Sequence, residues 1–132
     1  MNRKLKQFNA KYYDKPVLIT GQKNIYYLTG SEIDGLWILL YKYRIFVITS
    51  KMTEAEAKRY FSSKADIITV SVSLSKSLAD FCKLKKIKEI YIETSDLSFS
   101  IFDAVEKNMQ TKAISVNKID SLTDLRKIKD ND

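Results

Sequence analysis

Apolar residues recur along the chain with two spacings, one typical of helices and one typical of strands. Residues 3–12 place apolar side chains among basic ones at helical spacing, which predicts an amphipathic helix. Residues 16–19 form an apolar run that predicts a short buried strand. A short helix is predicted over residues 24–28 and is closed by Gly30, because glycine suits the left-handed position after a helix end.

The next segments predict a hairpin followed by a helix. Residues 35–41 and 44–49 are apolar and β-rich, and only Lys42 and Tyr43 separate them, so the two segments are predicted to pair as antiparallel strands. Thr53 and Glu56 have the spacing of a capping box, which predicts side-chain capping at the start of a helix that runs to about Ser62.

The second half of the chain alternates strand-like and helix-like segments. Ser98 is predicted to cap one of its helices. Strands are predicted at residues 66–72, 87–93 and 113–116, and helices at residues 74–84, 98–109 and 121–128. This order predicts an α/β sandwich in which helices cover the faces of a mixed sheet. In that arrangement Tyr27, Leu28 and Trp37 are expected in the core or in helix packing.

Composition narrows the class of protein. The 132 residues are 45% hydrophobic and 30% charged, which is typical of one compact globular domain. Residues 1–7 are basic, but no apolar signal segment follows them, and the apolar run at residues 36–40 is far too short to cross a membrane. The single cysteine, Cys82, excludes an intrachain disulfide. A cytoplasmic protein without membrane contacts is expected.

The absence of histidine excludes several kinds of catalytic site. Without it, no Ser–His or Cys–His triad is possible, and the commonest general base is missing. Catalysis by this chain would have to use carboxylates, lysine, tyrosine or Cys82. Cys82 follows Phe81 on a predicted helix face, where it is expected to be a small buried apolar residue.

Charge is unevenly distributed along the sequence. The net charge is +7; residues 1–64 hold 12 Lys and Arg against 5 Asp and Glu, whereas residues 65–132 hold 11 of each. A basic first half is compatible with an acidic partner or with a lysine-rich solvated surface. No arginine-rich run or glycine-rich loop accompanies the charge, which argues against nucleic acid as the partner.

Four motifs, in order, resemble those of one family. Residues 24–30 read Asn-Ile-Tyr-Tyr-Leu-Thr-Gly and resemble the N-I-x-Y-L-T-G signature of the creatinase/prolidase N-terminal domain. Residues 48–57 stand where that family has a hairpin ending in T-D-x-R-Y-x-x-x-A, and residues 92–98 are similar to its strand, Glu and L-S/T pattern. Residues 125–129 match L-R-x-I-K. The resemblance extends from about Lys15 to Lys129.

The sequence departs from the family pattern in two places. Ser50, Lys51 and Met52 stand where the family usually has an acid, arginine and tyrosine. The loop after Gly30 lacks the usual Phe and Gly-Ser pair, so the substrate preference is expected to differ from that of a standard dipeptidase.

The resemblance implies a fold and a domain boundary. The expected fold is a three-layer α/β/α sandwich with a mixed, mostly six-stranded sheet of the ribonuclease H-like kind. Residues 1–132 are then one N-terminal domain, and the helix from about residue 121 is expected to lead toward a C-terminal catalytic domain. Asp132 is accordingly expected to be a boundary within a longer protein.

The resemblance also implies a non-catalytic role for this chain in an Xaa-Pro dipeptidase or aminopeptidase. Two divalent ions, of manganese, cobalt or zinc, are expected in the catalytic domain, and no metal ligand or catalytic residue is assigned here. The chain is expected to pack on that domain, to contribute to a homodimer and to cap the site that cleaves short proline-containing peptides. The residues expected in the capping loop are Thr29, Gly30, Ser31, Glu32, Ile33 and Asp34.

Other interpretations remain open at this point. Glu32 and Asp34 are as compatible with a solvated loop tip as with a position facing the substrate. The same fold also serves as a non-enzymatic binding module, for which the basic first half would be the partner surface. A creatinase-like amidinohydrolase would share the domain but act on a different substrate.

Overall fold

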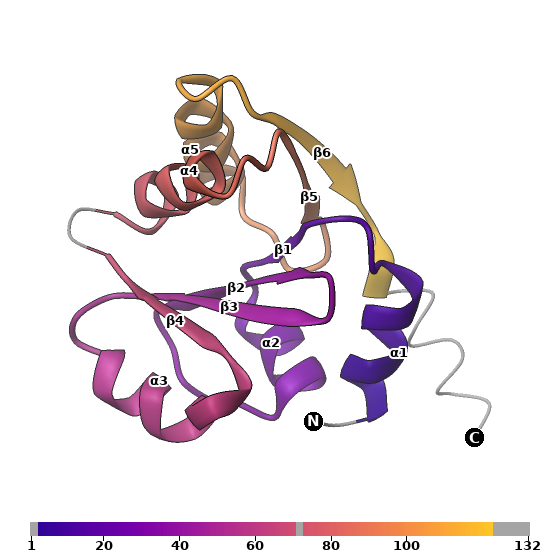
Figure 1. Cartoon of the computed structure of the whole chain (residues 1–132), viewed down its shortest axis with the longest axis vertical. Coiled ribbons are helices and arrows are strands. Elements are labelled where there is room, and N and C mark those ends of the chain that lie inside the picture. Colours follow the sequence, from indigo (N-terminus) through magenta and orange to yellow (C-terminus); the bar gives the residue numbers. More distant parts are fainter. Residues whose placement is uncertain (1–2, 71–72, 123–132) are drawn as a thin grey trace.

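The computed structural model describes residues 3–70 and 73–122, and within them the chain forms a six-stranded sheet with helices on both faces (Figure 1). The helices are α1 (Arg3–Lys11), α2 (Gln22–Thr29), α3 (Glu54–Phe61), α4 (Leu74–Leu84) and α5 (Phe99–Gln110), with a 3₁₀ turn at Ser62–Lys64. The strands are β1 (Val17–Ile19), β2 (Leu36–Tyr41), β3 (Arg44–Thr49), β4 (Asp66–Thr69), β5 (Glu89–Glu93) and β6 (Ser115–Ile119).

The strand order is β4-β3-β2-β1-β5-β6. Strand β2 pairs antiparallel with both β1 and β3, whereas the pairs β3–β4, β1–β5 and β5–β6 are parallel. Five strands therefore run in one direction and only β2 runs in the other. We call the end of the sheet where these five strands finish the carboxyl edge, and the end where they start the amino edge.

Two apolar clusters, one on each face of the sheet, make up the core. One cluster joins α1, α2 and α3 to the sheet through residues such as Phe8, Leu28 and Phe61, and the other joins α4 and α5 through Leu78 and Val105. Figure 1 shows the same division, with α4 and α5 on one side of the strands and α1, α2 and α3 on the other. The predicted three-layer α/β/α fold with a mixed six-stranded sheet is confirmed.

Strand β2 shows why the sheet is buried on both faces. Its side chains alternate between the two clusters, with Ile38 and Leu40 in one and Trp37 and Leu39 in the other. Because both faces are covered by helices, the strand is continuously apolar instead of alternating with polar residues. The prediction that Trp37 belongs to the core is confirmed, since its side chain is only 8% exposed.

The predicted hairpin is confirmed, with β2 and β3 paired from Leu36↔Thr49 to Tyr41↔Arg44. Its turn residues Lys42 and Tyr43 have φ values of 51° and 64°. Positive φ at both positions is the geometry of a tight two-residue hairpin turn, in which glycine and asparagine are usual.

The predicted capping box at α3 is wrong. Thr53 is the N-cap residue, but its side chain makes no capping hydrogen bond. Its hydroxyl instead lies 2.5 Å from that of Thr49 and 3.2 Å from that of Ser50, and Glu56 is exposed. Thr49, the last residue of β3, thus occupies the Thr53 hydroxyl that a capping box would require. The predicted cap of α5 is confirmed, because Ser98 Oγ accepts from the N–H of Ile101 at 3.2 Å.

Boundaries in the second half differ from prediction by a few residues. The last strand begins at Ser115, two residues later than predicted, because Ala113 has φ 58° and ends the turn after α5. Strand β4 ends at Thr69, and residues 71–72 of its predicted range lie outside the described residues. Ser121 and Leu122 are helical, while the rest of the predicted final helix, including the motif at residues 125–129, also lies outside them.

Candidate functional site

The carboxyl edge brings together loops from most of the chain. Strands β1, β3, β4, β5 and β6 end there, and β2 begins there. The 29–34 loop, which precedes β2, therefore lies at this edge beside the segments that follow β3 and β5. Ligands of open α/β sheets bind beyond the carboxyl ends of the strands. This rule and the sequence-predicted capping loop point to the same edge.

Hydrogen bonds to its own side chains fix the backbone of the 29–34 loop. Thr29 Oγ1 accepts from the N–H of Ser31 at 3.1 Å, and Ser31 Oγ accepts from the N–H of Ile33 at 3.2 Å. Asp34 Oδ1 then accepts from the N–H of Gly35 at 2.9 Å. The loop is therefore preorganised, because each of these side chains supplies an acceptor that a neighbouring strand would otherwise provide.

The six predicted loop residues divide into inward and outward positions. Ser31 is fully buried and Ile33 is 8% exposed, and Ile33 packs in the core cluster below the loop. Gly30, Glu32 and Asp34 are exposed, and Thr29 is half-buried at the end of α2. Ser31 and Ile33 thus hold the loop to the core, and only the outward residues are available to a ligand or partner.

Open depressions flank the loop on both sides. One, of about 450 Å³, is lined by Gln22, Lys23, Tyr26 and Glu32. The other, of about 460 Å³, is lined by Ile33, Glu56, Arg59 and Tyr60. Each has an exposed tyrosine in its wall, with Tyr26 54% and Tyr60 47% exposed. Both depressions contain charges of either sign, which suits the peptide backbone and termini of a partner segment or substrate.

Residues of α2 and α3 hold the loop at its start and near its middle. At its start, the Tyr60 hydroxyl of α3 donates to the Thr29 carbonyl at 2.8 Å, and the N–H of Gly30 bonds to the Tyr26 carbonyl at 2.7 Å. Gly30 follows the last residue of α2 and has φ 79°, the left-handed backbone conformation that glycine adopts readily after a helix end. On the other side, Gln22 Nε2 donates to the Glu32 carbonyl at 3.0 Å.

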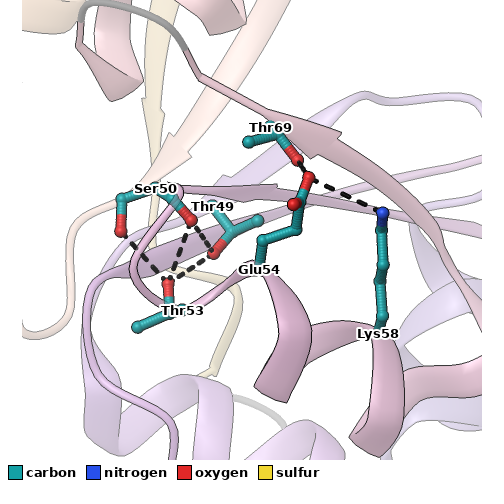
Figure 2. A network of polar contacts seen from close by, with 6 residues as sticks. All are labelled: Thr49, Ser50, Thr53, Glu54, Lys58 and Thr69. Atoms are coloured by element: carbon teal, nitrogen blue, oxygen red, sulfur yellow. Dashed lines mark hydrogen bonds and ion pairs between the residues drawn. The ribbon is translucent and has the colours of Figure 1, made fainter.

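A network of hydroxyl and carboxylate groups lies beside the loop, at the ends of β3 and β4 (Figure 2). Thr49 is fully buried, and its hydroxyl lies 2.5 Å from the Thr53 hydroxyl and 3.2 Å from the Ser50 carbonyl oxygen. Thr69, paired with Thr49 across the two strands, donates to Glu54 Oε2. Lys58 Nζ lies 3.6 Å from the same carboxylate oxygen. Figure 2 shows the Glu54 side chain extending from the start of α3 toward Thr69 on β4.

The network perturbs the acidity of Glu54. The hydrogen bond from Thr69, and then the charge of Lys58, lower the pKa of the Glu54 carboxyl below its ordinary value. The ionised carboxylate also lies in the first turn of α3, where negative charge is favourable. The contacts with Thr69 and Lys58 hold the ionised Glu54 side chain in place and fix α3 against β4. It does not resemble a general base, which needs a pKa near the working pH.

A second carboxylate at this edge, Glu93, is buried and follows the last apolar residue of β5. It accepts from the N–H of Ser95 at 3.1 Å and from the N–H of Ser121 at 2.8 Å, and the Ser121 hydroxyl also donates to it. Ser95 in turn accepts, through its carbonyl, from Asn24 Nδ2 at 2.6 Å. Glu93 thereby links the segments after β5 and β6 to the start of α2, the helix that carries the loop.

Sequence reasoning found the loop but missed the groups that hold it. The Glu93 position was identified as part of a motif, and its role as an acceptor depends on Ser121, which is distant in sequence. The Thr49–Thr53 pair gave no sequence signal beyond the spacing that was taken for a capping box. Lys51 and Met52, in the segment that departs from the family pattern, are exposed, and Met52 is 95% exposed.

The described residues offer no group of three or more Asp, Glu, Cys and His side chains arranged to hold a metal ion. The two divalent ions implied by the resemblance therefore do not fit residues 3–70 and 73–122. Cys82 is fully buried, as predicted, and burial raises the pKa of its thiol to about 12. None of the helices in the described ranges is long and apolar enough to cross a membrane.

A comparison with family models and a comparison with solved structures both match the chain to the domain that its motifs resemble. The sequence model described as the creatinase/prolidase N-terminal domain matches residues 3–128. No curated protein matches the chain at a significant level. Among solved structures, the chain is similar to an Xaa-Pro dipeptidase from Bacillus anthracis, with a TM-score of 0.76 and 16% identity over 91% of this chain and 34% of that one.

Two further solved structures are similar over most of their own length. An Xaa-Pro aminopeptidase from Streptococcus pyogenes gives a TM-score of 0.74 and 26% identity, covering 93% of this chain and 92% of that one. The N-terminal domain of a cytoplasmic peptidase from Mycobacterium tuberculosis gives a TM-score of 0.74 and 17% identity, covering 93% and 95%. The chain thus spans about a third of the Bacillus dipeptidase and nearly all of the two shorter structures.

Proposed function

The chain belongs to the creatinase/prolidase N-terminal domain family, and from this premise we propose that it is the non-catalytic N-terminal domain of a proline-specific metallopeptidase. In that role it packs against a C-terminal catalytic domain and caps the site where a short proline-containing peptide is cleaved. The catalytic domain, and not this chain, holds the two divalent ions, of manganese, cobalt or zinc. The assembled protein is proposed to be a cytoplasmic homodimer.

The observation that carries the proposal is the position of the 29–34 loop. It lies at the carboxyl edge, as does Ser121, where the described part of the last segment begins its helical turn. A domain attached after this segment in a longer protein would start from the edge that presents the loop. Glu32 and Asp34 would then face the attached domain or its symmetry mate.

The loop has the properties that a cap needs. Its inward residues anchor it to the core, so it keeps its shape without a partner, and preorganisation reduces the entropic cost of closing over a substrate. The depressions on either side expose Tyr26 and Tyr60 as flat contact surfaces for a partner or peptide. A rigid cap excludes longer peptides by its volume, which favours short substrates.

In the direct test, the whole reading frame that contains this chain is expressed. Its protein product is then compared with residues 1–132 alone. With added manganese, the longer protein is expected to hydrolyse an Xaa-Pro dipeptide, and residues 1–132 are expected to show no hydrolysis. If the reading frame stops directly after Asp132, or if the longer protein cleaves creatine instead of the dipeptide, the peptidase proposal is wrong.

Capping is tested separately in the longer protein. Replacing Glu32 and Asp34 by glutamine and asparagine is expected to change the ratio of kcat/KM values for dipeptide and tetrapeptide substrates. The matched control is Glu106→Gln on α5, which lies on the opposite face of the sheet from α2. An unchanged substrate-length preference in the loop variant would argue that Glu32 and Asp34 are only a solvated tip.

A further inference from the structure

The amino edge, opposite the 29–34 loop, gathers lysine and tyrosine side chains from three separate segments. The segment before β1, the turn between β2 and β3, and the turn before β5 all meet there. Around an open depression of about 340 Å³ lie Lys15, Lys86 and Lys88, with Tyr41 and Tyr91 in its wall. The edge therefore combines positive charge with aromatic surface.

Aromatic rings continue this surface beyond the depression. Tyr13 and Tyr43 lie with ring centroids 4.8 Å apart, and both are exposed, at 44% and 57%. A hydrogen bond of 3.0 Å from the N–H of Lys42 to the Tyr13 carbonyl holds the hairpin turn against this pair. Lys42 Nζ lies 5.0 Å from the centre of the Tyr41 ring, so a lysine and an aromatic ring are also in contact at the turn.

The lysines at this edge are available to a ligand. None of Lys15, Lys42, Lys86 and Lys88 forms an ion pair within the described residues, whereas Arg44 is paired with Asp66. Lys15 Nζ is instead held 4.9 Å from the centre of the Tyr91 ring. Cations held over aromatic rings keep their charge for an incoming anion.

Two carboxylates, Asp14 and Glu89, also line the depression. Glu89 Oε1 is occupied, because it accepts from the Tyr91 hydroxyl and from Asn117 Nδ2 at 3.2 Å. The lysines outnumber these carboxylates at the edge. The carboxyl edge, by contrast, mixes both signs, because Glu32, Glu54 and Glu56 lie there beside Lys23, Lys58 and Arg59.

We propose that the amino edge binds single-stranded nucleic acid, with the lysines contacting phosphates and the exposed Tyr43–Tyr13 pair stacking on a base. Proteins that bind single strands combine a positive groove with aromatic platforms in this way. An acidic peptide would use the lysines but not the exposed ring faces. Duplex readout would need a helix or ribbon that enters a groove, and here the basic residues surround an open depression.

This proposal goes beyond the peptidase role and is independent of it, because the two surfaces lie at opposite edges of the sheet. Sequence composition argued against nucleic acid since no short segment is rich in arginine or glycine. The structure assembles the surface from residues 13–15, 41–43 and 86–91, each of which is unremarkable alone.

The test measures fluorescence anisotropy of a labelled oligothymidine of about twelve nucleotides with the 132-residue chain, from about 50 to 200 mM salt. Binding is expected to weaken steeply with salt. The variant Lys15→Gln/Lys86→Gln/Lys88→Gln should reduce the magnitude of the log–log salt slope by about 2, since each lost phosphate contact removes about 0.7. The charge-matched control changes Lys6, Lys51 and Lys107 to glutamine and should retain most of the slope.

The stacking contribution is tested at Tyr43. Tyr43→Phe should bind as the parent does, whereas Tyr43→Ser should lose about tenfold in affinity. Circular dichroism of each variant verifies that the fold is kept. No binding at low salt, equal losses in the two lysine variants, or displacement of the oligonucleotide by polyglutamate as readily as by unlabelled oligothymidine would each overturn the proposal.

Discussion

The buried carboxylate of Glu93 binds both the backbone N–H and the hydroxyl of Ser121, a residue 28 positions further along the chain. This contact joins the ends of β5 and β6 on the same edge as the 29–34 loop. Thr94 reinforces it, because its N–H bonds to the Ile119 carbonyl at 2.9 Å. The Glu93 side chain and the Thr94 backbone together therefore hold the segment from Ile119 to Ser121 against the end of β5.

Replacing Glu93 by alanine is expected to lower the free energy of unfolding by about 2–4 kcal/mol, because the buried N–H of Ser121 and the half-buried N–H of Ser95 would lose their acceptor. Urea denaturation of the 132-residue chain measures the loss. The exposed Glu56 serves as the control, and Glu56→Ala should stay within about 0.5 kcal/mol of the parent. Equal effects of the two substitutions would contradict the role assigned to Glu93.

Gly30 and Gly35 form a matched pair for testing how the loop is held. Both have positive φ, 79° and 82°, so alanine at either position should cost about 1–2 kcal/mol in backbone strain. A Cβ at Gly30 would also meet the Tyr60 hydroxyl at 2.9 Å, whereas at Gly35 the nearest atom is 3.9 Å away. Gly30→Ala is therefore expected to be the more destabilising in thermal unfolding. In a Tyr60→Phe background this difference should shrink, and an unchanged difference would show that the hydroxyl is not its source.

Glu54 gives the stability of the chain a pH dependence. Its pKa is lower in the folded protein than the ordinary 4.5, first because of the Thr69 hydrogen bond and then because of Lys58. Its contribution is thus fully present above 4.5 and is lost as the pH falls through the lowered folded value. The stability difference between the parent and Glu54→Gln should accordingly be largest at neutral pH and decrease on acidification. Thr69→Val should reduce this pH dependence, and a difference that grows on acidification would refute the assignment.

Cys82 should be unreactive in the native chain. Full burial and a pKa of about 12 leave almost no thiolate at pH 8. A thiol-specific reagent such as an aromatic disulfide is expected to label the protein only after denaturant is added, at a rate that follows unfolding. Fast labelling of the folded chain at pH 8 would contradict the buried position assigned to this side chain.

Local sequence patterns predicted most of the elements. The apolar run at residues 36–40 and the two-residue connection at Lys42 and Tyr43 were enough to predict the β2–β3 hairpin, because strand pairing across a tight turn depends on neighbours in sequence. The cap of α5 by Ser98 was predicted for the same reason. The α3 capping box failed because the Thr53 hydroxyl had a competing partner on β3, which is a tertiary contact.

The candidate site was predicted only in part. Residues 29–34 were identified from a motif, but the sequence did not reveal that Ser31 and Ile33 face inward while Glu32 and Asp34 face outward. The Tyr60 hydroxyl that binds the Thr29 carbonyl comes from a helix 31 residues later in the chain. Such contacts depend on how α2 and α3 share one face of the sheet, which no local pattern encodes.

The sequence by itself determined the fold class, the absence of histidine chemistry and the family, because periodicity, composition and ordered motifs are properties of the linear chain. Only the tertiary structure decided how charge is distributed in space. The sequence placed the excess positive charge in the first half, whereas the sheet brings Lys15 of the first half and Lys86 and Lys88 of the second half to the same amino edge. Residues that are distant in sequence meet at one edge because parallel strands all start there. Each crossover connection has to return the chain to that edge before the next parallel strand begins.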